Sequence, residues 1–197
     1  MKQNEWREKI SNRSDLVARL SHLTGRKASN DDGAFEVLWK ILTEKRLIAS
    51  GAEGFINGDI KAVCFQEVPL QAMAENVLRG NTHYFGFGLR VNRGFFYRRG
   101  GRPVFYGEVD HLKKILPATE YWRIVSMNLN DPDRIIDWTH EREWRHPGDF
   151  EFDWSEIEVI VKDHTYFEKF INRCFEKNQT DILKGIHGII ALDSVIS

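Results

Sequence analysis

The stretch His140-Glu141-Arg142-Glu143-Trp144-Arg145-His146 brings two carboxylates, two guanidiniums, two imidazoles and one indole into seven residues. Because side chains alternate along a strand, this stretch as a strand would put Glu141, Glu143 and Arg145 on one face. Two carboxylates this close suit acid–base chemistry or the stabilisation of a developing cation. The alternative is a solvated strand edge, whose Glu and Arg side chains form surface ion pairs of little energetic weight.

Composition narrows the class of protein. The chain has 197 residues with 28 basic and 29 acidic side chains, so its formal charge of −1 gives no whole-molecule reason to expect nucleic acid. Its longest apolar runs are too short to cross a bilayer, and residues 1–9 contain no signal-peptide core. Cys64 and Cys174 make neither a disulfide framework nor a CxxC metal pattern. We therefore expect a cytoplasmic protein without a membrane partner.

The order of the expected elements favours an α+β fold. Phe35, Leu38, Trp39 and Leu42 recur at helical spacing, which predicts a helix that ends near residues 46–48. Asp31 or Asp32 is its expected N-cap. No repeat or linker divides the chain, so we predict a single domain over residues 1–197, with a mainly antiparallel sheet, flanking helices and a charged leader at 1–13. The other expected helices are 70–78, 110–116 and 166–175, with a capped helix start at 131–133. The other expected strands are 61–68, 84–91, 102–106 and 156–162, with a last short strand within 188–195.

Familiar catalytic motifs are absent from the sequence. His140 and His146 flank the two glutamates, but no second His or Cys cluster completes a ligand set, so we expect no metal site. Cys64 lies in an apolar stretch, which favours a buried and inert thiol. Gly86-Phe87-Gly88 lacks the third glycine of a dinucleotide-binding loop and indicates a strand that another backbone approaches closely.

Two polar patterns remain. In a strand, His22-Leu23-Thr24 would point its His and Thr side chains to the same face, and the alternative is an N-terminal turn built on Thr24 and Gly25. Residues 92–101 are expected to form a loop in which arginines surround three aromatic residues, a composition that suits contacts with phosphates and bases. The alternative for this segment is a solvated hairpin with an aromatic core face. Its candidate nucleic-acid-binding residues are Arg93, Arg98 and Arg99.

Several of these segments resemble one known family. Ser21-His22-Leu23-Thr24, the helix that follows, and Val63-Cys64-Phe65-Gln66-Glu67-Val68-Pro69-Leu70 resemble the AbiGi family of abortive phage-resistance proteins, which reads His-Phe-Thr, a helix and Cys-Phe-x-Asp-Ile-Pro-Leu. His83-Tyr84-Phe85-Gly86-Phe87-Gly88-Leu89 resembles the family's Tyr-Gly-x-Tyr-Gly-Ile segment, and Arg102-Pro103-Val104-Phe105-Tyr106 its Pro-Val-x-Tyr strand. The Glu-x-Glu-Trp-Arg stretch also recurs there, so the resemblance covers about residues 20–162.

That family is similar in turn to DarT-type ADP-ribosyltransferases, which open with His-x-Thr and carry a catalytic Glu late in the domain. The resemblance implies an ADP-ribosyltransferase-like fold with a split sheet, NAD as the cofactor, and a toxin or effector that modifies a macromolecule in phage defence or a toxin-antitoxin system. Glu143 would be the catalytic carboxylate, with Glu141 completing the Glu-x-Glu spacing. The residues implied to bind NAD are His22, Thr24, Tyr84 and Arg90, with Arg90, Arg93 and Arg98 as candidates for the diphosphate clamp.

Such glycosyl transfer builds positive charge on the ribose, and a fixed carboxylate stabilises that charge. Trp144 falls on the other strand face and is expected in the core. Two other functions remain open: a non-catalytic member of the same fold that serves as an antitoxin or binding module, and a nucleic-acid-binding protein that works through the arginine-rich segment. The expected partners are therefore a nucleic-acid or protein acceptor and a cognate antitoxin or toxin.

Overall fold

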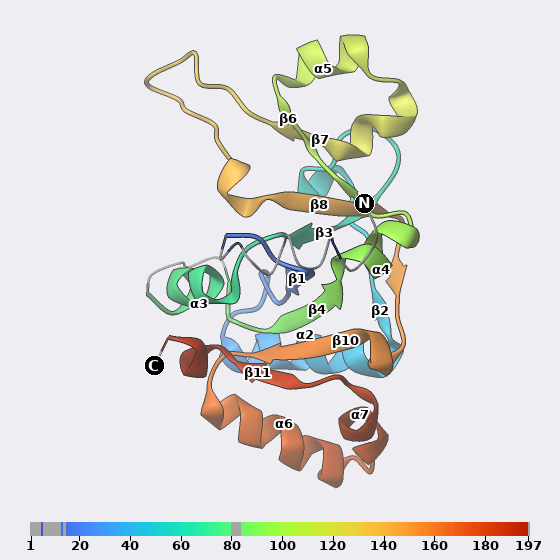
Figure 1. The fold of residues 1–197 in the computed structure, drawn as a ribbon, viewed down its shortest axis with the longest axis vertical. Helices are drawn as coiled ribbons and strands as arrows, with labels where there is room; N and C mark the ends of the chain where they lie inside the picture. The colour runs from blue at the N-terminus through green and yellow to red at the C-terminus, as the bar shows by residue number, and fades with distance from the viewer. Residues whose placement is uncertain (1–4, 6–12, 14, 80–83, 197) are drawn as a thin grey trace. The chain divides into compact units, whose positions relative to one another are not determined.

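A computed structural model describes residues 5, 13, 15–79 and 84–196 of the chain (Figure 1). Its contacts divide the chain into two compact units: unit 1 is 1–46, 68–93 and 152–197, and unit 2 is 47–67 and 94–151. The described residues mix helices with mainly antiparallel strands, as predicted. Most of the expected leader at 1–13 lies outside the described residues, and the single domain stays a prediction.

The sheet of unit 1 is centred on β4 (Gly88–Asn92). Strands β1 (Arg19–Leu23) and β10 (Ile157–Val161) pair with it in antiparallel orientation, and β11 (Ile189–Ala191) pairs with β10 in parallel. A Cβ atom at Gly88 would lie 2.0 Å from the carbonyl oxygen of His22 on β1. The prediction that another backbone approaches this glycine-containing strand closely is therefore confirmed.

Helix α2 (Asp31–Glu44) confirms the helical spacing read from the sequence. Of the four residues on the predicted apolar face, Trp39 is half-buried and the other three are buried. The expected N-cap is wrong by one residue: Asn30 Oδ1 accepts a hydrogen bond from Gly33 N at 2.8 Å. Among the described helices, none is long and apolar enough to cross a bilayer. The other helices of unit 1 are α3 (Leu70–Arg79), α6 (His164–Glu176), α7 (Thr180–Gly185) and the 3-10 helices η4 (Trp154–Glu156) and η5 (Leu192–Val195).

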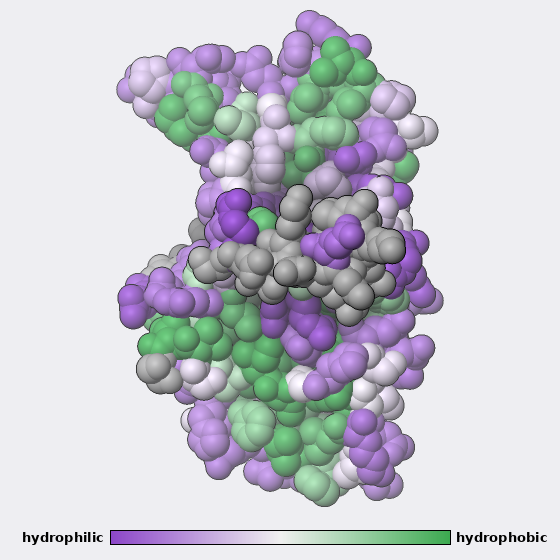
Figure 2. Space-filling view, viewed as in Figure 1, coloured by the Kyte–Doolittle hydropathy of each residue, from purple (hydrophilic) through white to green (hydrophobic). Residues whose placement is uncertain are grey.

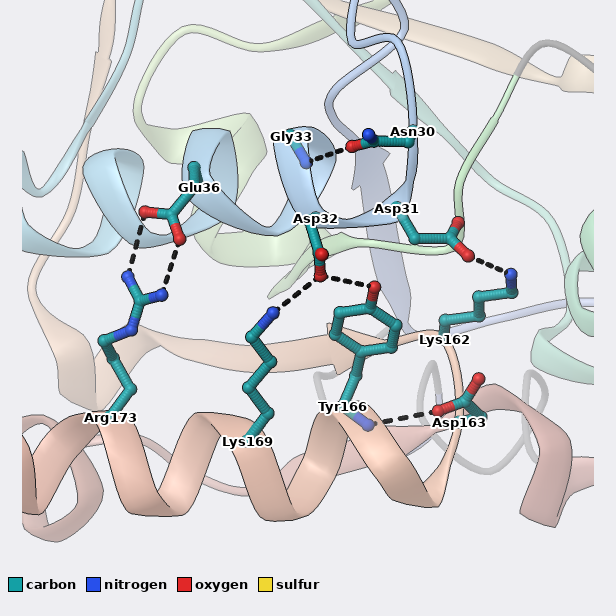
Figure 3. Close-up of polar contacts among 10 residues, drawn as sticks. All are labelled: Asn30, Asp31, Asp32, Gly33, Glu36, Lys162, Asp163, Tyr166, Lys169 and Arg173. Carbon is teal, nitrogen blue, oxygen red and sulfur yellow. Dashed lines mark hydrogen bonds and ion pairs between the residues drawn. The ribbon is translucent and has the colours of Figure 1, made fainter.

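A row of charged contacts joins α2 to α6 and to Lys162 at the end of β10 (Figure 3). The hydrogen bond from Lys169 holds the pKa of the Asp32 carboxyl below its usual range, and that from Arg173 does the same for Glu36. These side chains are partly exposed, so each pair adds little stability on its own. The pairs of the row are Asp31 with Lys162, Asp32 with Tyr166 and Lys169, and Glu36 with Arg173.

Unit 2 is built on a ladder in which β8 (Glu143–Pro147) pairs in antiparallel orientation with β3 (Ala62–Gln66) and with β5 (Arg102–Pro103). The ring centroids of three fully buried aromatic residues lie 4.5–5.4 Å apart: Phe65, Phe96 and Phe150. The parallel pair of β6 (Phe105–Gly107) and β7 (Ile124–Ser126) forms a second ladder. The other elements are α5 (Val109–Ile115), β9 (Phe150–Glu151), and the 3-10 helices η1 (Ala52–Gly54), η2 (Ala118–Arg123) and η3 (Thr139–Glu141).

Three local predictions are wrong. Residues 93–98, predicted as part of a loop, form α4 (Arg93–Arg98), which with β2 (Arg46–Leu47) lies where the chain passes from one unit to the other. Residues 131–133 form a turn instead of a helix start, with Asp133 N donating to Asp131 Oδ1 at 3.0 Å. The strand expected from residue 140 begins at Glu143, because η3 and Arg142 precede it.

Candidate functional site

Glu143 and Arg145 lie on one face of β8, which has a partner strand on each side. Glu143 is opposite Gln66 of β3, whereas Arg145 is opposite Cys64 of β3 and Arg102 of β5. The exposed fractions of Glu143 and Arg145 are only 8% and 3%. The predicted shared face is confirmed for these two residues, and the solvated strand edge is wrong for them.

The two side chains form a buried ion pair. Arg145 Nε donates to Glu143 Oε1 at 2.7 Å, and Arg145 Nη1 donates to the carbonyl oxygens of Trp122 at 2.7 Å and Ile124 at 3.1 Å. A charge removed from water needs such partners, because an unpaired buried ion costs several kcal/mol. Arg145 therefore fixes Glu143 through one carboxylate oxygen and is itself fixed by two backbone carbonyls.

Two neutral groups border this pair. The hydroxyl of Tyr106 accepts a hydrogen bond from Glu143 N at 2.7 Å, and burial, with the charges of Glu143 and Glu141, raises the pKa of Tyr106 to about 12. Burial and the charge of Glu143 also raise the pKa of the Cys64 thiol well above its ordinary value. At neutral pH both groups keep their protons, which agrees with the prediction of an inert Cys64.

Glu141 is not on the strand with Glu143. It ends η3, where its N–H donates to the carbonyl oxygen of Trp138 at 3.1 Å, and Arg142 follows with a left-handed φ of 45°. This turn breaks the alternation of side chains, so the expected face shared by Glu141 and Glu143 is wrong. The role of Glu141 in catalysis stays a prediction.

Trp144 points away from Glu143, as the alternation of β8 requires. Its indole Nε1 donates to Glu67 Oε2 at 2.8 Å, and its ring lies 6.5 Å from Phe96 in an edge-on arrangement. It is half-buried, so it borders the aromatic core of unit 2 instead of lying inside it.

In unit 1, His22 is on β1, and Thr24 follows the strand directly. Thr24 is buried, and its N–H donates to the carbonyl oxygen of Phe87 at 2.8 Å. His22 is half-buried and is opposite Leu89 of β4. Tyr84 lies four residues before β4 and is also half-buried. Their roles toward NAD stay predictions.

Arg90 lies on the sheet face opposite to His22, because the register pairs it with Ser21. Its Nη1 donates to Glu158 Oε2 at 2.9 Å, and the same carboxylate contacts Arg19 at 3.1 Å. Burial lowers the pKa of Arg90, although Glu158 opposes this effect. Arg90 thus already has an anionic partner within unit 1, and His22 is not beside it.

The arginine-rich segment is a helix whose aromatic residues are mostly used inside unit 2. Phe96 is fully buried, and Phe95 lies 6.3 Å from Phe150. Tyr97 is exposed, but the guanidinium of Arg102 covers its ring at 4.0 Å. Of the three predicted nucleic-acid contacts, Arg93 is half-buried and Arg98 is exposed, while Arg99 donates to the carbonyl oxygen of Glu151 at 3.2 Å.

No group of three or more His, Cys, Asp or Glu side chains within the described ranges could hold a metal ion. His146, one of the two histidines considered above, has Nε2 2.9 Å from the carbonyl oxygen of Arg99. It packs between Phe96 and Phe150 at 6.0 and 5.2 Å. This imidazole therefore has a structural role in unit 2, through its hydrogen-bonding distance to Arg99 and its packing against two aromatic rings.

Sequence reasoning missed the buried partners of Glu143. Arg145 was placed on the right face, but an Arg two residues from a Glu usually indicates a surface pair. Tyr106 was read only as part of a strand, 37 residues away in the chain. The alternation of Glu-x-Arg beside the apolar β3 sequence was the one signal that could have indicated a buried pair.

Comparison of the chain with family models, with curated proteins and with solved structures gave no match.

Proposed function

We propose that this chain is an NAD-dependent ADP-ribosyltransferase, acting as a toxin or effector in phage defence or in a toxin-antitoxin system. The observation that carries the proposal is the carboxylate of Glu143, whose Oε1 is held in unit 2 by Arg145. A carboxylate fixed before the substrate arrives needs no reorganisation during the reaction. Such preorganised groups supply a large part of the rate enhancement in many enzymes.

NAD supplies the ADP-ribosyl group: nicotinamide leaves with the electron pair of the broken carbon–nitrogen bond, and the acceptor's nucleophile bonds to the same ribose carbon and releases one proton. Glu143 stabilises the positive charge that builds up on the ribose. Arg145 positions Glu143, and Tyr106 anchors its backbone. Loss of one such electrostatic contact costs about 10²–10³-fold in kcat.

His22 and Thr24 are proposed to hold the adenosine ribose and the nicotinamide side of NAD. An imidazole and a hydroxyl suit ribose hydroxyls and a carboxamide, because each can both donate and accept hydrogen bonds. Glu141 is proposed to support Glu143, and Tyr84 is proposed to support His22 and Thr24. Arg90 fits a diphosphate clamp less well than these residues fit their roles, because Glu158 already neutralises it.

A second candidate is a non-catalytic member of the same fold that acts as an antitoxin or binding module. The same ion pair also supports this second candidate, since Glu143 is only 8% exposed and already has a cationic partner. A buried pair that serves folding alone needs no substrate. The two candidates differ in whether the chain transfers ADP-ribose.

The test is transfer of label from NAD, radioactive in its adenylate part, to macromolecules of a total cell lysate. The wild-type protein and Glu151→Gln, a matched control at an exposed glutamate of unit 2, should label the same acceptor. Glu143→Gln/Arg145→Met should label none, since it removes the carboxylate without leaving Arg145 unpaired. Labelling by this double variant would contradict the proposed role of Glu143, and no labelling by the wild type would favour the non-catalytic module.

A further inference from the structure

Residues 127–142 connect β7 to β8 and extend away from the core of unit 2 (Figure 1). We call residues 128–138 the excursion. From residue 129 to residue 138, every side chain except Ile136 is exposed. Apart from the 3-10 helix η3 and one isolated bridge, this connection has no helix or strand of its own, and long connections of this kind are usually functional.

The exposure of the excursion does not come from a lack of structure. Asn128 and Ile136 exchange two backbone hydrogen bonds of 2.9 Å, which close the excursion at its base. Asn128 Oδ1 also accepts from Asn130 N, and Asn130 Nδ2 donates to Glu108 Oε1 at 2.8 Å. These bonds hold the excursion in one shape and attach it to unit 2 beside α5.

Three large apolar side chains are presented by this closed excursion. Leu129, Ile135 and Trp138 are 52%, 54% and 47% exposed. At the upper left of Figure 2, green apolar surface stands among purple hydrophilic residues. Full burial of such a side chain contributes about 1.5–3 kcal/mol. Since about half of each side chain stays exposed in the folded protein, a partner that covers the rest would gain roughly half of that figure from each.

The charge on the excursion limits the kind of partner. Residues 128–142 carry four carboxylates and two guanidiniums, a net charge of −2 with His140 neutral. Nucleic acid would be repelled by this sign, because its binding depends on neutralising phosphates. Apolar anchors, among them a Trp, within a charged rim are typical of a protein interface. Complementary charge would come from lysine and arginine side chains of the partner.

We propose that the excursion is the docking surface for a partner protein whose contact face is basic around an apolar pocket. Trp138, with the imidazole of His140 6.0 Å from its ring, is the central anchor, and Leu129 and Ile135 complete the apolar contact. Asp131 and Asp133 steer the partner through their charge. This inference does not depend on whether Glu143 is catalytic.

The test begins with a photoreactive phenylalanine analogue placed at Ile135 in the full chain, in its native cells. The matched probe position is Phe175 of unit 1, which is also a large exposed apolar residue. We expect one discrete protein adduct from position 135 and none of the same size from position 175. Adducts to nucleic acid or to a second copy of this chain, equal adducts from both positions, or no adduct would overturn the proposal.

The crosslinked protein is then purified, and its Kd for the chain is measured with variants. Trp138→Ser/Ile135→Ser should weaken binding at least tenfold, whereas Phe175→Ser should leave the Kd unchanged. Asp131→Asn/Asp133→Asn should weaken binding and reduce its salt dependence. Because these side chains are exposed, melting temperatures should stay close to the wild-type value. Unchanged Kd values in the excursion variants would show that the adduct arose from chance proximity.

Discussion

The two units differ in how they place charge and apolar surface. Unit 1 places charged pairs such as Glu36–Arg173 at its surface, and of the described large apolar side chains that are exposed, only Val37 and Phe175 belong to it. Unit 2 buries the pair Glu143–Arg145 and leaves Phe55 and the apolar side chains of the excursion exposed. Buried ions and exposed apolar groups both work against folding, and such features gather where function requires them. The proposed roles of Glu143 and of the excursion agree with this difference between the units.

The largest effect is expected from Arg145→Met, which breaks the buried pair. It leaves the carboxylate of Glu143 without its guanidinium and two backbone carbonyls without their donor. Breaking a buried pair on one side costs about 3–5 kcal/mol. Urea unfolding of the variant and the wild type measures this difference in the free energy of unfolding.

The double variant Glu143→Gln/Arg145→Met is the control, because it removes both charges together. Its loss should be clearly smaller than that of Arg145→Met, since replacing a whole buried pair is often close to neutral. Equal losses in the single and double variants would contradict the description of the pair as two mutually dependent buried charges.

A smaller loss is expected in unit 1 from Glu158→Gln. Glu158 contacts both Arg90 and Arg19, whose side chains are 12% and 27% exposed, so water can partly replace it. Hydrogen bonds to charged groups contribute roughly 1.5–3 kcal/mol, and the lower end applies here. Thermal unfolding in parallel with Arg145→Met decides the order. A loss from Glu158→Gln that exceeds that from Arg145→Met would break the comparison between the units.

Phe55→Gly should stabilise the protein. This variant tests whether unit 2 carries residues that oppose folding. Phe55 has a left-handed φ of 63° and is 75% exposed. Relief of the left-handed backbone is worth about 1–2 kcal/mol, and the greater chain entropy of glycine offsets about 0.5–1 kcal/mol of it. The expected net gain therefore lies between about 0 and 1.5 kcal/mol, with a midpoint near 0.75 kcal/mol. A lower melting temperature than wild type would mean that the Phe55 ring contributes packing that its exposure hides.

The smallest effect concerns the surface pairs of unit 1 at low pH. The pKa values of Asp32 and Glu36 are lowered in the folded protein, so the unfolded chain binds more protons there. Their stabilisation is present above the unfolded values of about 4 and is lost as the pH falls through the folded ones. Asp32→Asn/Glu36→Gln should therefore flatten the fall in unfolding free energy below about pH 4.5. An unchanged slope in urea titrations from pH 6 to pH 3 would assign the acid sensitivity to other carboxylates.

Much of the fold could be predicted from local sequence. The spacing of Phe35, Leu38 and Leu42 identified α2, because one apolar stripe at helical period has few other readings. Helix α4 was missed because its arginines and nearby glycines are typical of a loop. The helix places Phe96 against Phe65 and Phe150 in the core of unit 2. Local composition cannot report a contact with residues so distant in the chain.

The candidate site was predictable only in part. The alternation of side chains along β8 predicted that Glu143 and Arg145 share a face. It did not predict that both are buried, since charged residues are almost never fully buried unless paired. Their burial depends on β3 and β5, which come from two other parts of the chain. Glu141 was misplaced because the left-handed Arg142 has no signature in the sequence. Tyr106 could be found only through its contact with Glu143 N.

The most direct test of the proposed catalytic role of Glu143 is the rate at which the purified protein releases nicotinamide from NAD. We expect measurable release by the wild type, and kcat about 10²–10³-fold lower for Glu143→Gln/Arg145→Met, with KM nearly unchanged. The double variant should remain folded at the assay temperature, as circular dichroism would verify. Equal kcat values for the two proteins, or no release by the folded wild type, would contradict the proposed role of Glu143.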